Sequence, residues 1–424
     1  LPVLSSATAL WYQSHYVAPL APPPTQTLPS PNGFDTLKEA LRLQEGPVHW
    51  VPAQGWEKQP LAERQKLLAR NQPFLAKTRE ALTQEYCIPR RIAHTPGGTN
   101  TEFLNSHLGQ LIFAAQTYAD SGNVPDAMRC ALDSLELGVI VPRGGDFNAR
   151  DTGSSYEAYG QEIVWKLAAQ VDASAAREAV TRLEKMEKRR WPLPESLREE
   201  LQQGSVARTL SVFRGGAIYA WEMLRLKRAD EAERPEDRKG TRTSDLWSLA
   251  REVYGGPKGV IDTNADCVKQ AQERFAAPWN PDRPGLVFKG PASFHVYYGD
   301  IPTYADYSSM EWVEFFYRTQ AALLRVHLAL RAYSLERGSY PNSLDTLVEE
   351  GYLKAVPGDP FSPTRAPLRY KPSGTAFTLW SVGPDGIDDG GRASLAKRRQ
   401  PTDRFPSCDV VGGDRRLMMI SSLP

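Results

Sequence analysis

The sequence is poor in the residues that build most metal and redox sites. Its 424 residues include six histidines and four cysteines, and no two cysteines form a C-x-x-C pair. The motifs H-E-x-x-H and G-x-S-x-G are also absent, so zinc, thioredoxin-type and nucleophile-elbow chemistry have no support. We expect four buried thiols, although an even number also permits two disulfides: Cys87, Cys130, Cys267 and Cys408.

The chain also lacks an excess of either charge. Its 51 basic residues are balanced by 50 acidic ones, whereas nucleic-acid-binding domains usually carry a basic surplus. We therefore expect no nucleic-acid partner. At roughly 100–200 residues per domain, the length allows two to four domains, and a hydrophobic content of 41% can fill ordinary cores.

A long hydrophobic run is missing as well. A complete transmembrane helix needs about 20 apolar residues, and the nearest candidate is the shorter, uncharged segment Leu1–Trp11. Trp11, Tyr12 and Tyr16 have the positions of interfacial aromatic residues. Because the chain begins with Leu rather than Met, we expect an upstream segment that completes a membrane anchor. A short buried segment is the alternative.

Proline is abundant, with 34 residues, and it first gathers in a spacer. Residues 19–33 contain six prolines and no charge, a composition that favours an extended, semi-rigid chain. From residue 34 to residue 255 the apolar residues instead follow the period of 3.6 that is typical of helices. We therefore predict a membrane-proximal segment, a linker and then a helical domain.

The clearest helical unit is predicted over residues 103–138. Two apolar stripes are separated by Ser121-Gly122-Asn123, and the order of Tyr118, Gly122 and Ala127 resembles one tetratricopeptide hairpin. Stable stacks of such repeats need about three copies. We therefore predict an isolated helical hairpin.

Two segments around this hairpin are predicted to lack regular helices. The glycine-rich residues 143–155 (RGGDFNARDTGSS) do not end in the Gly-Lys-Ser/Thr of a phosphate-binding P-loop, so we predict a surface loop. Residues 256–310 are rich in Pro, Gly, Tyr and Trp, and we predict an irregular connector or a few short strands there. The aromatic residues of 279–317 permit a solute-binding cleft between body and tail, although a core position is the more ordinary role.

The C-terminal part begins with a strong amphipathic helix at Glu311–Arg337, which Gly338 ends. Arginines along it exclude a membrane span, since each charge at a bilayer centre costs about 2.5–3.5 kcal/mol. A short helix and the turn Pro357–Pro360 follow. The alternating residues of 368–382 predict a β-hairpin.

This order of elements resembles the soluble domain of the major pseudopilins of type II secretion systems. The resemblance rests on the segments "RGSYPNSLDTLVEEGYLKAVPGDPFS" and "LRYKPSGTAFTLWSVGPDGIDDGG". It implies an α+β domain in which the long helix packs on a small antiparallel sheet. It also implies a calcium-binding loop formed by Asp385, Asp388 and Asp389, in which the ion has a structural role. A solvated Gly/Asp loop is the alternative.

The overall layout also resembles uncharacterised membrane-anchored proteins of planctomycete-like bacteria, a likeness that implies no activity. The predicted fold class is a mainly α N-terminal body of helical hairpins followed by the α+β pseudopilin-like domain. The predicted divisions are the membrane-proximal segment 1–18, the linker 19–33, the helical domain 34–255, the connector 256–310, the pseudopilin-like domain 311–392 and the basic tail 393–424.

With no catalytic constellation in the sequence, we expect a non-enzymatic structural or interaction protein. We expect it on the extracytoplasmic side of a cell envelope, anchored through its N-terminal segment and partnered by other envelope proteins or by itself. It could be an accessory subunit of an envelope complex or filament. The alternative is a hydrolase of envelope polymers that uses carboxylates in the helical body.

Overall fold

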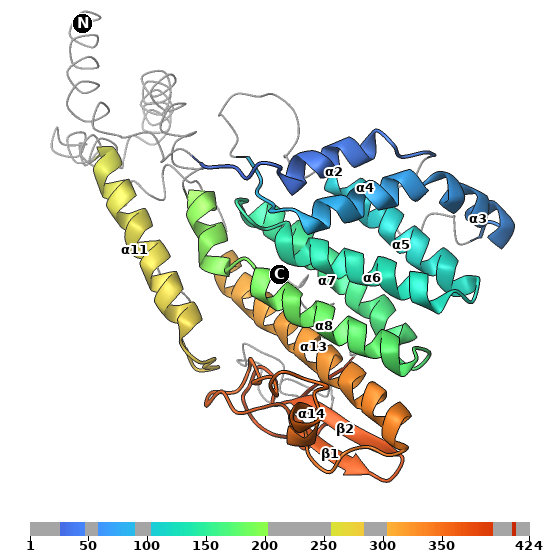
Figure 1. Cartoon of the computed structure of the whole chain (residues 1–424). Coiled ribbons are helices and arrows are strands. Elements are labelled where there is room, and N and C mark those ends of the chain that lie inside the picture. Colours follow the sequence, from blue (N-terminus) through green and yellow to red (C-terminus); the bar gives the residue numbers. More distant parts are fainter. Residues whose placement is uncertain are drawn as a thin grey trace, which may run out of the picture.

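The computed structural model describes residues 26–46, 58–89, 103–201, 256–283, 303–392 and 409–412. These residues form a mainly helical protein with a small three-stranded antiparallel sheet near the C-terminus (Figure 1). The coarse prediction of a helical body followed by helix and sheet is therefore confirmed. The predicted segment 1–18, residues 19–25 of the linker and most of the tail 393–424 lie outside the described residues.

The helical body extends from α2 to α8. Several of its helices begin at a residue whose side chain accepts a hydrogen bond from a backbone amide of the first turn, as Asn123, Asp146 and Asp172 do. Residues 193–201 form a further helical stretch. The bounds are α2 Gly33–Leu41, α3 Leu61–Arg70, α4 Gln72–Thr83, α5 Leu104–Asp120, α6 Val124–Ile140, α7 Phe147–Leu167 and α8 Ala173–Arg189.

The predicted hairpin of residues 103–138 is confirmed as the pair α5 and α6. Gly122 supplies the turn with a φ of 75°, a backbone conformation that favours glycine. Asn123 then caps α6 by accepting a hydrogen bond from the Asp126 amide at 3.2 Å. The hairpin also packs against α7, which lies along α6.

The prediction of a surface loop over residues 143–155 is wrong from residue 147 onward, because α7 already begins at Phe147. Its glycines serve close packing rather than a loop. A Cβ atom on Gly153 would lie 2.6 Å from the carbonyl oxygen of Gly138 on α6, and one on Gly160 would lie 2.9 Å from the carbonyl oxygen of Ala131. The two helix backbones therefore approach more closely than any side chain allows.

Replacing Gly153 with alanine is expected to destabilise the protein by about 2 kcal/mol. Overpacking costs about 3 kcal/mol at the upper end of its usual range, and the helix preference for alanine offsets about 1 kcal/mol of that. Urea unfolding measures the difference. Gly358→Ala is the control, since a Cβ there first meets another atom at 3.6 Å. An equal effect of both substitutions would contradict close backbone packing as the cause.

The predicted irregular connector 256–310 also needs correction, because it contains the helix α11, Gly256–Ala276. Pro257 follows Gly256 in the first turn, where proline is compatible with a helix. The side chains of Cys267, Val268 and Ala271 pack with residues of the 193–201 stretch in a small second core. The long C-terminal helix α13 likewise begins earlier than predicted, at Thr303, and ends at Arg337.

Helix α13 joins the body to the sheet. It packs along α8 and α7 on one side and contacts β2 and β3 on the other. After the short helix α14 (Asp345–Glu349), strands β1 (Arg369–Ser373) and β2 (Ala376–Ser381) form the predicted hairpin. Strand β3 (Val410–Val411) pairs with the end of β2. One hydrophobic core runs from α2 to β3, so the helical body packs directly against α13 and the sheet.

Among the described helices, none is long and apolar enough to cross a membrane. The prediction of buried thiols is confirmed for Cys130 and Cys267, whose burial raises the thiol pKa to about 12. Cys87 is only half-buried, and Cys408 lies outside the described residues.

Candidate functional site

The predicted calcium loop follows β2 and is attached to the hairpin by Asp388. One carboxylate oxygen of Asp388 accepts hydrogen bonds from Trp380 Nε1 at 2.9 Å and from the Gly390 amide at 3.0 Å. The other oxygen pairs with Arg369 Nε at 3.1 Å. Burial opposes the charge of Asp388, but these hydrogen bonds and Arg369 outweigh it and lower the pKa of the carboxyl. Asp388 therefore already serves as an anchor of the loop.

The other two predicted ligands have different surroundings. Asp385 accepts a hydrogen bond from the Ile387 amide at 3.1 Å, whereas Asp389 contributes its own amide to Asp409 at 3.2 Å. Asp409 is buried and also accepts from the Gly391 amide at 2.7 Å. Within the described ranges, no group of three or more His, Cys, Asp or Glu residues has an arrangement that could hold a metal ion.

Asp409 was not predicted as part of this loop, since it lies in the predicted basic tail and no motif marks it. Burial raises its pKa, the two amide hydrogen bonds lower it, and the neighbouring Asp388 and Asp389 raise it further. The loop thus has a fourth carboxylate that is contributed from beyond the pseudopilin-like segment. Calcium binding remains a prediction.

A buried aspartate also holds the turn before the hairpin. Asp359 accepts hydrogen bonds from the Phe361 amide at 3.0 Å, from Ser381 Oγ at 2.6 Å and from the Val382 amide at 2.9 Å. It is 2% exposed, and burial raises its pKa against the effect of these donors. The turn Pro357–Pro360 is therefore tied directly to the end of β2.

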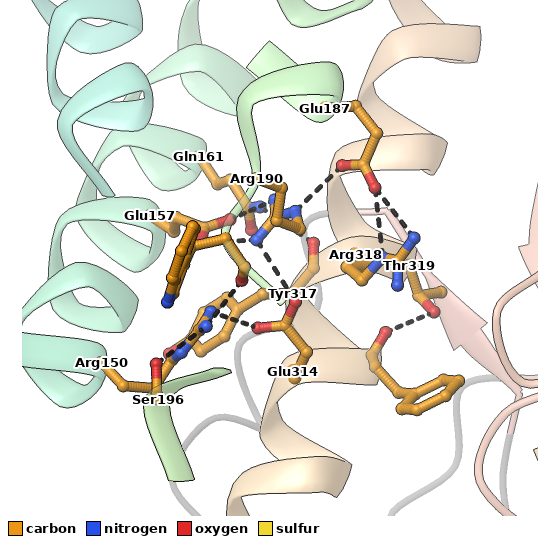
Figure 2. A network of polar contacts seen from close by, with 12 residues as sticks. Arg150, Glu157, Gln161, Glu187, Arg190, Ser196, Glu314, Tyr317, Arg318 and Thr319 are labelled. Carbon is orange, nitrogen blue, oxygen red and sulfur yellow. Dashed lines mark hydrogen bonds and ion pairs between the residues drawn. The ribbon is translucent and has the colours of Figure 1, made fainter. Parts of the chain in front are cut away.

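A network of buried charges joins α7, the end of α8 and α13 (Figure 2). Arg190 donates two hydrogen bonds to the Glu157 carboxylate, each 2.8 Å long. Arg150 pairs with Glu314 at 3.1 Å, and Arg190 Nη1 lies 3.8 Å from the other oxygen of Glu314. All four side chains are at most 6% exposed. Burial raises the pKa of Glu157, and Arg190 opposes that rise.

The network continues at its edge through Glu187 on α8. One oxygen of Glu187 accepts from Arg190 at 3.0 Å, and the other accepts from Arg318 on α13 at 3.1 Å. Burial disfavours the charge of Glu187, but the two arginines outweigh it and lower its pKa. A second set of ion pairs links α4, α6 and α8 through Asp133 and Glu136.

The hydrolase alternative places its carboxylates in the helical body, where Glu157 and Glu187 of this network lie. Glu157, Glu314 and Glu187 each face at least one arginine within 4 Å, and such charge-assisted hydrogen bonds hold a carboxylate in a fixed position. Such groups stabilise helix contacts.

A cavity of about 220 Å³ lies beside this network, between α8, α13 and the turn Pro357–Pro360. Glu187 is the one carboxylate in its lining, together with two arginines and apolar side chains. The residues that line it are Leu183, Glu187, Arg318, Ala321, Ala322, Arg325, Pro357, Gly358 and Pro360. The sequence did not predict this cavity, because its walls come from three separate segments.

The aromatic residues that could have formed a solute-binding cleft belong to the core where they are described. Trp279 packs against Phe315 and Phe361 with ring centroids 5.1 Å away in both cases. Its Nε1 donates to the carbonyl of Pro384 at 2.8 Å. Trp312 and Phe316 are buried as well. This cluster attaches the chain after α11 to α13 and to the loop that contains Asp385, Asp388 and Asp389, called the aspartate loop below.

Comparison of the chain with protein-family models, with curated proteins and with solved structures found no match. The arguments about function below therefore rest on the residues and their geometry.

Proposed function

We propose that the chain is a non-enzymatic structural or interaction protein on the extracytoplasmic side of a cell envelope, held there by its N-terminal segment. Its C-terminal unit, from α13 to the aspartate loop, would be a pseudopilin-like module that contacts other envelope proteins or further copies of the chain. The helical body would position this module at a distance from the membrane.

The observation that carries the proposal is the set of hydrogen bonds around Asp359. The two segments on which the pseudopilin resemblance rests are separate in the sequence, and Asp359 of the first binds Ser381 and Val382 of the second. A chance likeness of two short segments does not require that they meet. Their direct contact supports one folded module, and the packing of Phe377 against His327 of α13, with ring centroids 5.5 Å apart, adds to that support.

The module also exposes apolar side chains. Leu335 near the end of α13 is 45% exposed, and Ile387 in the aspartate loop is 44% exposed. Single exposed apolar residues are common, so they do not define an interface by themselves. They are nevertheless suitable positions at which to test for one.

The test uses the full chain expressed in bacterial cells. A photo-crosslinking amino acid replaces Leu335 or Ile387, and Lys66 on the exposed surface of α3 is the control position. Illumination is expected to give crosslinked species of defined mass from the two module positions and not from Lys66. Equal crosslinking at all three positions, or none at the module, would contradict the interaction role.

Location is tested separately in the same cells. A cysteine introduced at Lys66 is expected to react with a membrane-impermeant maleimide in intact cells whose outer barrier has been opened. Labelling only after the cytoplasmic membrane is disrupted would contradict the extracytoplasmic location. A chain without the introduced cysteine measures any reaction of the native thiols.

Calcium is proposed as a structural ion of this module. Calcium prefers six to eight oxygen ligands, and Asp385, Asp388 and Asp389 would supply carboxylate oxygens to it. We expect millimolar Ca²⁺ to raise the melting temperature and expect Asp389→Asn to abolish that rise. Mg²⁺ at equal ionic strength is the control for unspecific screening. An unchanged melting temperature with Ca²⁺ would contradict a calcium site in this loop.

A further inference from the structure

The cavity beside the ion network has a regular origin on α13. Arg318 and Arg325 are seven residues apart, which is about two helical turns, so they lie on the same face of the helix. Ala321 and Ala322 lie between them, and all four residues line the cavity. Two long cationic side chains separated by two small residues leave open space that the turn Pro357–Pro360 covers from the opposite side.

The two arginines differ in how their charge is compensated. Arg318 pairs with Glu187 at 3.0 Å, and Glu187 is shared with Arg190. The Nε of Arg325 is buried and has no hydrogen-bond partner among the described residues. Burial lowers the pKa of Arg325, and the more distant Glu187 and Glu184 oppose this only in part. The lining therefore carries two positive charges and one negative charge, a surplus of one.

An arginine with a buried, unpaired Nε is costly, because the desolvated charged donor receives nothing in return. If Arg325 were an ordinary surface arginine, its whole guanidinium would lie in water. Instead, the Arg325 side chain is half-buried and lines a cavity with room for about seven water molecules at about 30 Å³ each. The cavity therefore lies against an arginine whose charge is compensated only in part.

We propose that this pocket binds a small organic carboxylate, whose anionic group is held by Arg325 with help from Arg318. A guanidinium group offers parallel donors that match a carboxylate in two-point contact. The single surplus charge fits a monoanion. Leu183, Pro357 and Pro360 in the lining favour a ligand with a short apolar part over a bare inorganic ion. This binding does not depend on the proposed envelope role.

The experiment is calorimetric titration of the full chain at constant ionic strength. The probes are butyrate and benzoate, with inorganic phosphate and butylammonium as ligands of other chemistry. We expect saturable binding of a carboxylate and none of butylammonium. Arg325→Gln is expected to weaken carboxylate binding at least about tenfold, which corresponds to about 1.4 kcal/mol. Lys188→Gln removes an equal charge from α8 outside the cavity lining and is expected to leave binding unchanged.

Ala321→Met provides a second variant that keeps every charge but fills the cavity. It is expected to abolish binding while the fold is retained, as judged by circular dichroism. If the folded wild-type chain binds no carboxylate, the proposal is wrong. It is also wrong if Lys188→Gln weakens binding as much as Arg325→Gln, since attraction would then be general. Saturable phosphate binding without carboxylate binding would likewise overturn the assigned ligand class.

Discussion

Between pH 6.5 and pH 4, the free energy of unfolding is expected to fall by about 3 kcal/mol less in His107→Leu than in the wild type. His107 on α5 is fully buried, with Phe74 and Phe103 packed against its ring at centroid distances of 5.0 and 5.8 Å. Burial among these groups lowers the pKa of the imidazole to about 4, while a backbone contact to Phe103 opposes the shift. The fold therefore favours the neutral ring.

The direction of this pH effect follows from proton binding. Below pH 6.5 the unfolded chain protonates His107 while the folded chain does not, so stability falls as the pH decreases, until the folded group titrates near pH 4. A difference of about 2.5 pKa units at about 1.4 kcal/mol each gives the expected magnitude. Other groups titrate in the same range, and comparing the variant with the wild type removes their contribution.

Urea unfolding at pH 7 and at pH 4.5 measures the effect. The wild type is expected to lose more of its unfolding free energy between these values than His107→Leu loses. His327→Leu is the matched comparison, because burial and Arg331 lower the pKa of His327 to about 4 as well, but its ring is only half-buried between Trp165 and Phe377. Identical pH profiles for wild type and His107→Leu would contradict a buried neutral imidazole.

The sequence was most informative where one short stretch determines its own structure. The α5–α6 hairpin could be predicted, since both apolar stripes and the break at Gly122 lie within residues 103–138. The β-hairpin of residues 368–382 could be predicted from its alternation in the same way, and its first strand extends to Ser373. Local periodicity and turn residues are sufficient for such elements.

The failures have two different causes. Glycine in residues 143–155 was interpreted as loop-forming. Gly153 instead lies in α7, where the absence of a side chain allows the backbone of α6 to approach closely. That reason is tertiary and leaves no mark in the local pattern. Residues 256–276 are helical although the connector is rich in Pro and Gly, since Pro257 occupies the first turn. Composition averaged over 55 residues concealed a helix of ordinary length.

The candidate sites show the same division between local and distant information. The three aspartates of the predicted loop are close in sequence and could be found there. Asp409 and the cavity around Arg325 depend on chain segments that meet only in the fold. The charges of α8 are typical of a solvated helix in the sequence, yet Glu187 and the adjacent Arg190 contribute to the network that joins three helices. Long-range pairing of charges cannot be deduced from one sequence.

Removing the guanidinium of Arg190 should be the most destabilising single change in this network. In Arg190→Met, Glu157 loses both of its hydrogen bonds from Arg190 and Glu314 loses a positive neighbour, while both carboxylates stay buried. Removing one partner of a buried ion pair costs about 3–5 kcal/mol, because the remaining charge is uncompensated. The exposed pair of Arg337 and Glu350 provides the control, and Arg337→Met is expected to cost at most about 1 kcal/mol.

The pH dependence of Arg190→Met identifies the uncompensated carboxylate as the cause. Without Arg190, the pKa of Glu157, already raised by burial, rises further. A carboxyl whose folded pKa exceeds its unfolded value stabilises the fold below the unfolded pKa, and this stabilisation is lost as the pH rises through the folded pKa. The loss of unfolding free energy in Arg190→Met, relative to the wild type, should therefore be larger at pH 8 than at pH 5. Adding Glu157→Gln should reduce both the deficit and its pH dependence, because a neutral amide needs no counter-charge. An equal deficit at both pH values would instead assign the loss to the packing of the Arg190 side chain.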